Sequence, residues 1–193
     1  MGERTRSFLC LELEPVLRAT LGEWLDSLRK LAPKLKWVDG DAVHLTLKFL
    51  GEQPTDRLTA LRARLPEALA AKSHRSFYLE LSGVGAFPNF RAPRVLWMDL
   101  AGETEDLCEL WRTVEGLATR MGFEPEGKPF RPHLTLARIK DPSDFSLTLA
   151  RTLSECDPPS GRWRVSCITL MKSELRASGP QYTPLATFPL YRV

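Results

Sequence analysis

The sequence lacks most of the short motifs that mark a bound metal, cofactor or nucleotide. Its four cysteines show no C-x-x-C spacing and no H-E-x-x-H segment occurs, so we expect no metal site. No glycine-rich phosphate loop opens a helix, which argues against a doubly wound nucleotide-binding sheet. We therefore expect neither a metal nor an organic cofactor.

Long apolar runs are also absent. No stretch is long enough to span a bilayer, and the first six residues are polar and charged, unlike a signal peptide. The net charge is only +3, which does not indicate a large sequence-independent nucleic-acid surface but is compatible with a local anion site. These features predict a cytoplasmic protein with no membrane partner, and its 193 residues suffice for a stable hydrophobic interior.

Histidine is scarce, yet two of the three histidines open the same tetrapeptide, His-Leu-Thr-Leu, at residues 44–47 and 133–136. Side chains alternate between the two faces of a strand, so in each copy the His and Thr share one face while the leucines enter the core. Histidine changes charge near neutral pH, and a matched pair suggests one acid and one base. If both act on one phosphate, we expect the two imidazoles about 5–8 Å apart across an open groove.

A single copy of this motif would mean little. A strand rich in Leu and Thr is common, and one His on it is more often a partly buried, hydrogen-bonded structural residue. Two copies with the same residue types in the same order favour the catalytic interpretation. In that interpretation the Thr46 and Thr135 hydroxyls are hydrogen-bond donors beside His44 and His133.

Basic side chains gather near the two motifs. They are Lys48, Arg91, Arg94, Lys128, Arg131, Arg138 and Lys140. Such a group could bind a phosphate or could be solvated surface, because Arg and Lys occur along the whole chain, and the sequence favours neither explanation. The third histidine, His74, stands in a polar stretch and is expected to be exposed.

Hydrophobic periodicity indicates alternating helices and strands. Helices are predicted over residues 16–31, from Pro54 and Thr55 onward with Thr55 as the cap, from 104 to about 122, and over about 145–153. Strands are predicted over 8–13, 36–38, 43–50, 77–81, 95–100, 164–172 and 183–190, together with one that carries the second motif. Residues 83–94 are predicted to form a long loop near the cleft.

The order of these elements repeats weakly. In both halves a helix precedes the motif strand and another follows it, and the motifs lie close to half the chain length apart. We therefore predict an α+β fold with two pseudo-symmetric lobes, each an antiparallel sheet with helices outside, enclosing a central groove. The predicted organisation is a single bilobal domain over residues 1–193.

The two His-x-Thr-x motifs resemble those of the two-histidine (2H) phosphoesterase superfamily. The whole chain is similar to its RNA 2′,3′-cyclic phosphodiesterases, which are also named 2′-5′ RNA ligases (LigT or ThpR). Besides the motifs, matching segments lie at residues 6–8, 85–88, 93–97, 130–138, 173–175 and 179–182, spread over nearly the full length. One departure is Ser7, where the family usually has Leu.

This resemblance implies hydrolysis of a 2′,3′-cyclic phosphate to a 2′-phosphate without metal or nucleotide, with 2′-5′ RNA ligation as the reverse reaction. It makes His44 the proton donor to the departing 3′ oxygen and His133 the acceptor of the proton from the attacking water. Thr46 and Thr135 would hold the non-bridging phosphate oxygens. The symmetry of the motifs alone does not decide which histidine is the acid.

Two further residues have roles in the family that strict alternation does not explain. The resemblance makes Arg138 a phosphate-binding residue, yet alternation puts it on the face opposite His133. Either the strand ends or bulges after Leu136, or Arg138 reaches round, or its role is structural. Phe49 raises the same question, because it is either a base-stacking platform or a core aromatic.

Two other functions remain open. The chain could be a 2H phosphodiesterase that acts on a small cyclic nucleotide or a 2′-5′ oligoadenylate, or a non-catalytic module that binds RNA ends. The intact His and Thr residues of both motifs argue against the second, since a binding module needs no matched proton carriers. The expected partners are RNA ends or nucleotides that carry a 2′,3′-cyclic phosphate, and the expected state is a monomer.

Overall fold

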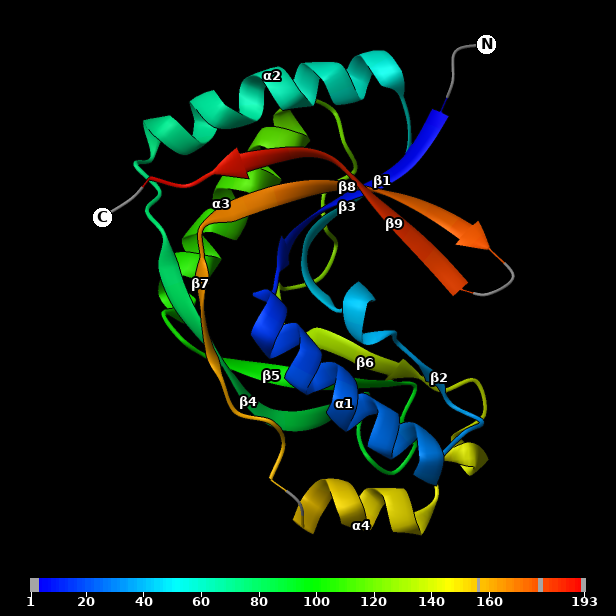
Figure 1. Cartoon of the computed structure of the whole chain (residues 1–193). Coiled ribbons are helices and arrows are strands. Elements are labelled where there is room, and N and C mark those ends of the chain that lie inside the picture. Colours follow the sequence, from blue (N-terminus) through cyan, green and yellow to red (C-terminus); the bar gives the residue numbers. More distant parts are fainter. Residues whose placement is uncertain (1–3, 156, 177–178, 192–193) are drawn as a thin grey trace.

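A single curled sheet runs through the molecule (Figure 1). The computed structural model describes residues 4–155, 157–176 and 179–191. The strands in this part are β1 (Arg4–Glu12), β2 (Lys36–Trp37), β3 (His44–Pro54), β4 (Phe77–Phe87), β5 (Val95–Gly102), β6 (Leu134–Arg138), β7 (Arg162–Val165), β8 (Cys167–Arg176) and β9 (Gly179–Pro189). Their order is β7-β4-β5-β6-β3-β1-β8-β9, with β2 also paired to β6, and these pairings are antiparallel.

The strand order confirms the α+β class. The two motif strands, β6 and β3, are the innermost pair, with three further strands outside each of them. The predicted lobes are the two halves of this sheet, and they join where β3 pairs with β6 at Leu45 and Leu134. Both leucines are fully buried, so the core is continuous across the junction.

Four helices cover the sheet in the described residues: α1 (Pro15–Leu31), α2 (Thr55–Ala71), α3 (Thr104–Arg120) and α4 (Leu147–Glu155). The helices α2 and α3 pack against each other and against β3, while α1 packs against α4. In Figure 1 the pair α1 and α4 lies with the β4–β7 half of the sheet and the pair α2 and α3 with the other half. None of the described helices has the length and apolar character required to cross a membrane.

The apolar helix faces agree with the predicted periodicity, with one exception. Leu17, Leu21, Leu25 and Leu28 of α1 are buried, whereas Leu31 is 47% exposed because it lies at the helix end. All four leucines predicted for the α2 face are buried. The predicted cap is wrong, since Pro54 occupies the N-cap position and Thr55 is already helical.

Several strand boundaries differ from the prediction, among them the starts of β1 and β9, which lie four residues earlier. The strand predicted over 164–172 is two strands, since the chain leaves β4 after Val165 and the next strand, which begins at Cys167, pairs with β1 from Thr169. Residues 83–87 belong to β4 and not to a loop, because a register shift between Leu81 and Val84 breaks the alternation without ending the strand. Likewise β3 continues past Gly51 to Pro54.

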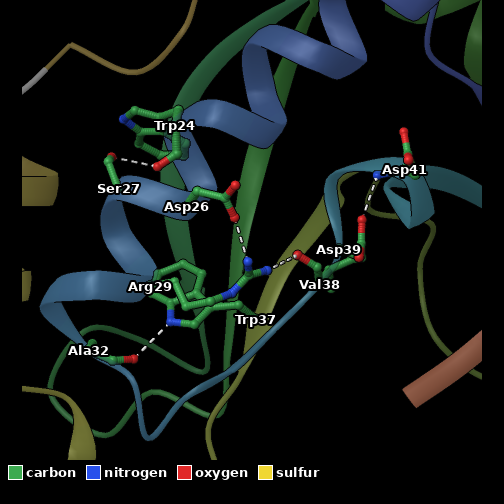
Figure 2. Close-up of polar contacts among 9 residues, drawn as sticks. All are labelled: Trp24, Asp26, Ser27, Arg29, Ala32, Trp37, Val38, Asp39 and Asp41. Atoms are coloured by element: carbon green, nitrogen blue, oxygen red, sulfur yellow. Dashed lines mark hydrogen bonds and ion pairs between the residues drawn. The ribbon is translucent and has the colours of Figure 1, made fainter. Parts of the chain in front are cut away.

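The segment before the first motif is tied to the end of α1 (Figure 2). The Trp37 indole Nε1 donates a hydrogen bond to the Ala32 carbonyl at 2.8 Å. The Arg29 guanidinium contacts Asp26 and donates to the Val38 carbonyl at 3.3 Å. These bonds hold β2 against the helix.

The 3₁₀ turn η1 (Gly40–Ala42) follows β2 and leads directly into β3. The Asp39 carboxylate caps it by accepting a hydrogen bond from the Asp41 amide at 3.1 Å. A Cβ on Gly40 would lie only 2.6 Å from the Gly22 Cα of α1, so the absence of a side chain lets turn and helix touch. The Asp39 cap and the contact with α1 therefore both fix the position of Ala42, which stands two residues before His44.

Candidate active site

The two motifs lie on one face of the sheet, as their alternation predicts. The four motif leucines, Leu45, Leu47, Leu134 and Leu136, are at most 3% exposed. The motif histidines and threonines are partly exposed. If the pairing of Leu45 with Leu134 continues by one residue each way, His44 lies across from Thr135 and Thr46 across from His133. Diagonal neighbours in such a pair are about 7–8 Å apart, which is compatible with the separation predicted for the imidazoles.

Both imidazoles are oriented by the same local hydrogen bond. His44 Nδ1 donates to the Ala42 carbonyl at 2.8 Å, and His133 Nδ1 donates to the Arg131 carbonyl at 2.7 Å. Because a carbonyl can only accept, Nδ1 carries the hydrogen in each ring. The Nε2 atoms are therefore the ones left to exchange a proton with a ligand.

His44 lies against two aromatic rings, one from β1 and one from β9. Its ring stacks on Phe8 of β1 with 4.7 Å between centroids and meets the Tyr182 ring of β9 edge-on at 5.2 Å. Burial lowers the pKa of His44, while the hydrogen bond to Ala42 and the charge of Glu12 act to raise it. Glu12 is the strand partner of His44 and accepts a hydrogen bond from Thr169 at 2.8 Å.

His133 has an equivalent pair of aromatic neighbours in the other lobe. Phe87 of β4 meets its ring edge-on at 5.2 Å between centroids, and Trp97 of β5 lies at 6.3 Å. The Trp97 ring lies directly over Gly85, where a Cβ would come within 2.1 Å of it. Gly85 thus permits the close approach that brings the indole to His133.

Sequence reasoning assigned no role to these aromatic side chains. The signal was present, because Phe8, Phe87, Trp97 and Tyr182 all fall in segments that carry the family resemblance. Contact with a histidine 36 residues or more along the chain depends on strand order, which periodicity does not reveal. Aromatic rings exclude water and fix the imidazole planes, so these residues complete the site.

A β-bulge in each motif strand determines the face of the sheet on which Phe49 and Arg138 lie. In β3 the partners of Thr46 and Lys48 are adjacent residues of β1, which leaves Leu47 unpaired. In β6 Leu136 is left unpaired against β5 in the same way. The extra residue reverses the alternation that follows it. Phe49 is accordingly 59% exposed, so the core alternative is wrong, and Arg138 is exposed on the face of His133.

The bulge also turns Lys48 away from the site. Its Nζ lies 2.9 Å from a Glu115 carboxylate oxygen and donates to the Glu124 carbonyl at 2.6 Å. The side chain is 2% exposed, so Lys48 is a buried structural ion pair and not part of an anion site. His74 is half-buried and bonds Thr113 at 2.7 Å, so the expectation that it is exposed is wrong.

Positive charge reaches the His44 side of the site from both lobes. Burial raises the pKa of the Tyr182 hydroxyl, whereas the positive charges of Arg138 and Arg6 act to lower it. Within the described residues, neither the Thr46 nor the Thr135 hydroxyl has a hydrogen-bond partner. The face thus offers two oriented imidazoles, two free hydroxyls and cations, a set suited to a phosphate.

Comparison with known proteins gives matches over nearly the whole chain. Residues 17–177 match the sequence model of the 2′-5′ RNA ligase superfamily. The RNA 2′,3′-cyclic phosphodiesterase of Methanothermobacter thermautotrophicus is 32% identical, over 97% of this chain and 100% of that protein. The protein of the same name from Aeropyrum pernix is 37% identical, over 83% of this chain and 89% of that protein.

A solved structure shares the fold. The crystal structure of E. coli LigT complexed with 3′-AMP superposes with a TM-score of 0.73 at 28% sequence identity. The superposition covers 97% of this chain and 99% of that chain. The family-model match includes both motif strands, and the superposition covers nearly the whole chain.

Proposed function

The chain belongs to the 2′-5′ RNA ligase superfamily, and from that membership we propose that it is an RNA 2′,3′-cyclic phosphodiesterase. The proposed reaction is hydrolysis of a 2′,3′-cyclic phosphate at an RNA end to a 2′-phosphate, with 2′-5′ ligation as its reverse. Both motifs come from one chain, so a monomer suffices for the reaction, and we place it in the cytoplasm.

One observation carries the proposal. Each motif histidine donates its Nδ1 hydrogen to the carbonyl two residues before it, which leaves Nε2 free on the shared face. A module that only binds RNA ends has no need of two imidazoles with the same fixed tautomer. General acid–base catalysis at phosphorus does need them, one on each side of the reacting group.

In the proposed mechanism His133 Nε2 accepts a proton from the attacking water as its oxygen bonds to phosphorus. The bond from phosphorus to the 3′ oxygen breaks, and His44 Nε2 gives its proton to that oxygen. Thr46 and Thr135 donate hydrogen bonds to the non-bridging oxygens, where negative charge increases. Proton exchange with solvent then returns both imidazoles to their starting states.

The proton donor has to be charged, whereas burial lowers the pKa of His44 in the free protein. The mechanism needs the charged imidazole, whereas burial favours the neutral one. A bound phosphate reverses that preference, because a nearby anion favours the imidazolium form. Glu12 acts in the same direction. We propose that His44 takes up its proton as the anionic substrate binds.

The bulged positions supply the remaining contacts in this proposal. Arg138, near Tyr182, binds a phosphate on the His44 side of the site. Phe49, exposed on the same face and 6.1 Å from Phe8 between ring centroids, stacks on a base. Neither residue takes part in proton transfer.

The experiment that tests the function is incubation with an oligoribonucleotide that ends in a 2′,3′-cyclic phosphate, followed by identification of the product end. A 2′-phosphate is expected, and the rate should be unchanged by exhaustive chelation with EDTA. An intact cyclic end or a 3′-phosphate product would refute the proposed reaction. Loss of activity in EDTA that a divalent ion restores would refute the metal-free mechanism.

A further inference from the structure

Two positive side chains face each other across β2 and β6. In this antiparallel pair Lys36 is the direct partner of Arg138, and Trp37 is the partner of Ala137. Direct partners point to the same face of a sheet. The Trp37 ring is turned toward α1 (Figure 2) and Ala137 is fully buried, so that pair faces the core. Lys36 and Arg138 therefore share the opposite face, which carries the polar side chains of the second motif.

No carboxylate balances these two charges within the described residues. Neither Lys36 nor Arg138 has an Asp or Glu oxygen within 4.0 Å of its charged group. The residue that pairs with Arg138 on β5, the strand on its other side, is the uncharged Val95. The nearby Lys34 does have such a partner, Asp144, at 3.4 Å. Like charges directly across a strand pair are destabilising, so an anion between them would relieve a repulsion built into the sheet.

The strands that carry the cation pair are held in place by their contacts with α1 and β5. The hydrogen bonds of Trp37 to Ala32 and of Arg29 to Val38 attach β2 to α1 on the residues next to Lys36. Arg138 is held by pairing to β2 and to β5. A rigid backbone beneath two flexible cations reduces the entropy lost on binding.

The pair lies toward the His44 end of the site and away from His133. Arg138 stands five positions after His133, which corresponds to about 16 Å of extended backbone, somewhat less with the bulge. Lys36 is at the same level of the sheet as Arg138, at the end of the second motif strand. At this level of the sheet the two cations can hold a phosphate next to the one that lies between the imidazoles.

We propose that Lys36, together with Arg138, binds the backbone phosphate of the nucleotide next to the reacting end. This inference rests on the proposed function and specifies its substrate class. An RNA chain carries such a phosphate, whereas a 2′,3′-cyclic mononucleotide does not. Lys36 thus makes the protein select RNA ends over small cyclic nucleotides.

The test compares the wild-type protein with Lys36→Gln and with the control Lys72→Gln. Lys72 is an exposed residue at the end of α2, so the control removes the same charge elsewhere. Equilibrium binding is measured for an oligoribonucleotide with a 2′-phosphate end and for a nucleoside 2′-phosphate. In parallel, kcat/KM is measured for the corresponding cyclic-ended oligonucleotide and cyclic mononucleotide.

Lys36→Gln should weaken binding of the oligonucleotide, and lower kcat/KM for the cyclic-ended oligonucleotide, by roughly 3- to 10-fold, on the scale of one hydrogen bond at an exposed site. Mononucleotide binding and turnover should stay within about twofold, and Lys72→Gln should match the wild type on both ligands. The slope of log binding constant against log salt should become shallower by about 0.7, the value for one phosphate of a single strand.

Equal binding of the oligonucleotide by wild type and Lys36→Gln would overturn the inference, as would an equal loss on both ligands. These outcomes differ from failure of the proposed function. That failure would appear as a wild-type protein that leaves both cyclic substrates intact, whatever the binding measurements show.

Discussion

At the scale of single residues, identical motifs have different surroundings. His44 is enclosed by Phe8 and Tyr182 and lies beside the Glu12 carboxylate. His133 has Phe87 and Trp97 as neighbours instead. Burial lowers the pKa of His44, so the two imidazoles are distinguished by environment although their sequence motifs are the same.

Titration of the ring resonances by NMR should report this difference. In the free protein His44 should titrate below 6.5, because burial disfavours its charged form. A saturating nucleoside 2′-phosphate should raise the pKa of His44, since the anion stabilises the imidazolium. If the ligand left His44 unchanged and raised only the pKa of His133, the proposed roles of the two histidines would be reversed.

Substitution of either histidine should remove most of the activity. His44→Ala and His133→Ala should each lower kcat by roughly 10²- to 10⁴-fold, the usual scale for loss of a general acid or base. His74→Ala is the control, because His74 bonds Thr113 outside the site and should keep near wild-type kcat. A full rate in either motif variant would exclude that histidine as a catalyst.

At the scale of elements, bulges and close contacts position the functional side chains. The bulges at Leu47 and Leu136 occur at the same place in both motifs, and each brings the residue two positions later onto the active face. The turn η1 positions the side chain of His44, because it holds the Ala42 carbonyl that orients the imidazole. Helix α1 supports that turn through the contact of Gly22 with Gly40.

Two alanine substitutions at this contact should have opposite effects. In Gly40→Ala the new Cβ would lie 2.6 Å from the Gly22 Cα, so the free energy of unfolding should fall by about 1–3 kcal/mol. In Gly22→Ala the nearest approach is 3.5 Å, and the helix interior should gain about 0.5–1 kcal/mol. Urea denaturation measures both, and equal destabilisation by the two changes would contradict the close contact.

Gly40→Ala should also lower kcat, because a displaced turn moves the carbonyl that fixes His44. Gly22→Ala should leave kcat close to that of the wild type. A Gly40→Ala protein with reduced stability but unaltered kcat would show that η1 does not position the histidine.

At the scale of the whole molecule, one sheet joins the two lobes. The buried pair of Leu45 and Leu134 links them, so the groups from both motifs are carried by one continuous core. Within one lobe, the Lys48 ion pair connects the first motif strand to Glu115 of α3 and to the Glu124 carbonyl in the segment after that helix. Stability and the geometry of the site therefore depend on the same contacts.

The free energy of unfolding should fall as the pH is lowered from about 7 to 5. Burial lowers the pKa of both His44 and His74 below 6.5 in the folded protein. Above that value the folded and unfolded states are both neutral at these rings, and the full stability is present. Below it the unfolded chain binds protons that the folded chain does not, so stability is lost as the pH falls.

The double variant His44→Gln and His74→Gln should flatten this dependence. Urea midpoints measured at several pH values between 5 and 7.5 provide the comparison. A slope as steep in the double variant as in the wild type would show that other groups are responsible.

Several features of this protein could be read from the sequence because they depend on residues close together in the chain. Alternation placed the motif leucines in the core and the motif histidines and threonines on the other face. The 3.6-residue period located the buried faces of α1 and α2. Repetition of one tetrapeptide indicated two related halves, and strand order confirms the α+β class.

Other features were decided only by the tertiary structure, because they depend on which strands become neighbours. The faces of Phe49 and Arg138 follow from bulges, and a bulge is a mismatch between two strands that neither strand reveals alone. Lys48 stands beside the motif in sequence, yet a carboxylate of α3 draws it into the core. The aromatic neighbours of each histidine and the opposition of Lys36 to Arg138 likewise arise from strand pairing over long distances in the chain. Local periodicity carries no information about such partners, since it specifies a face of a strand and not what lies across from it.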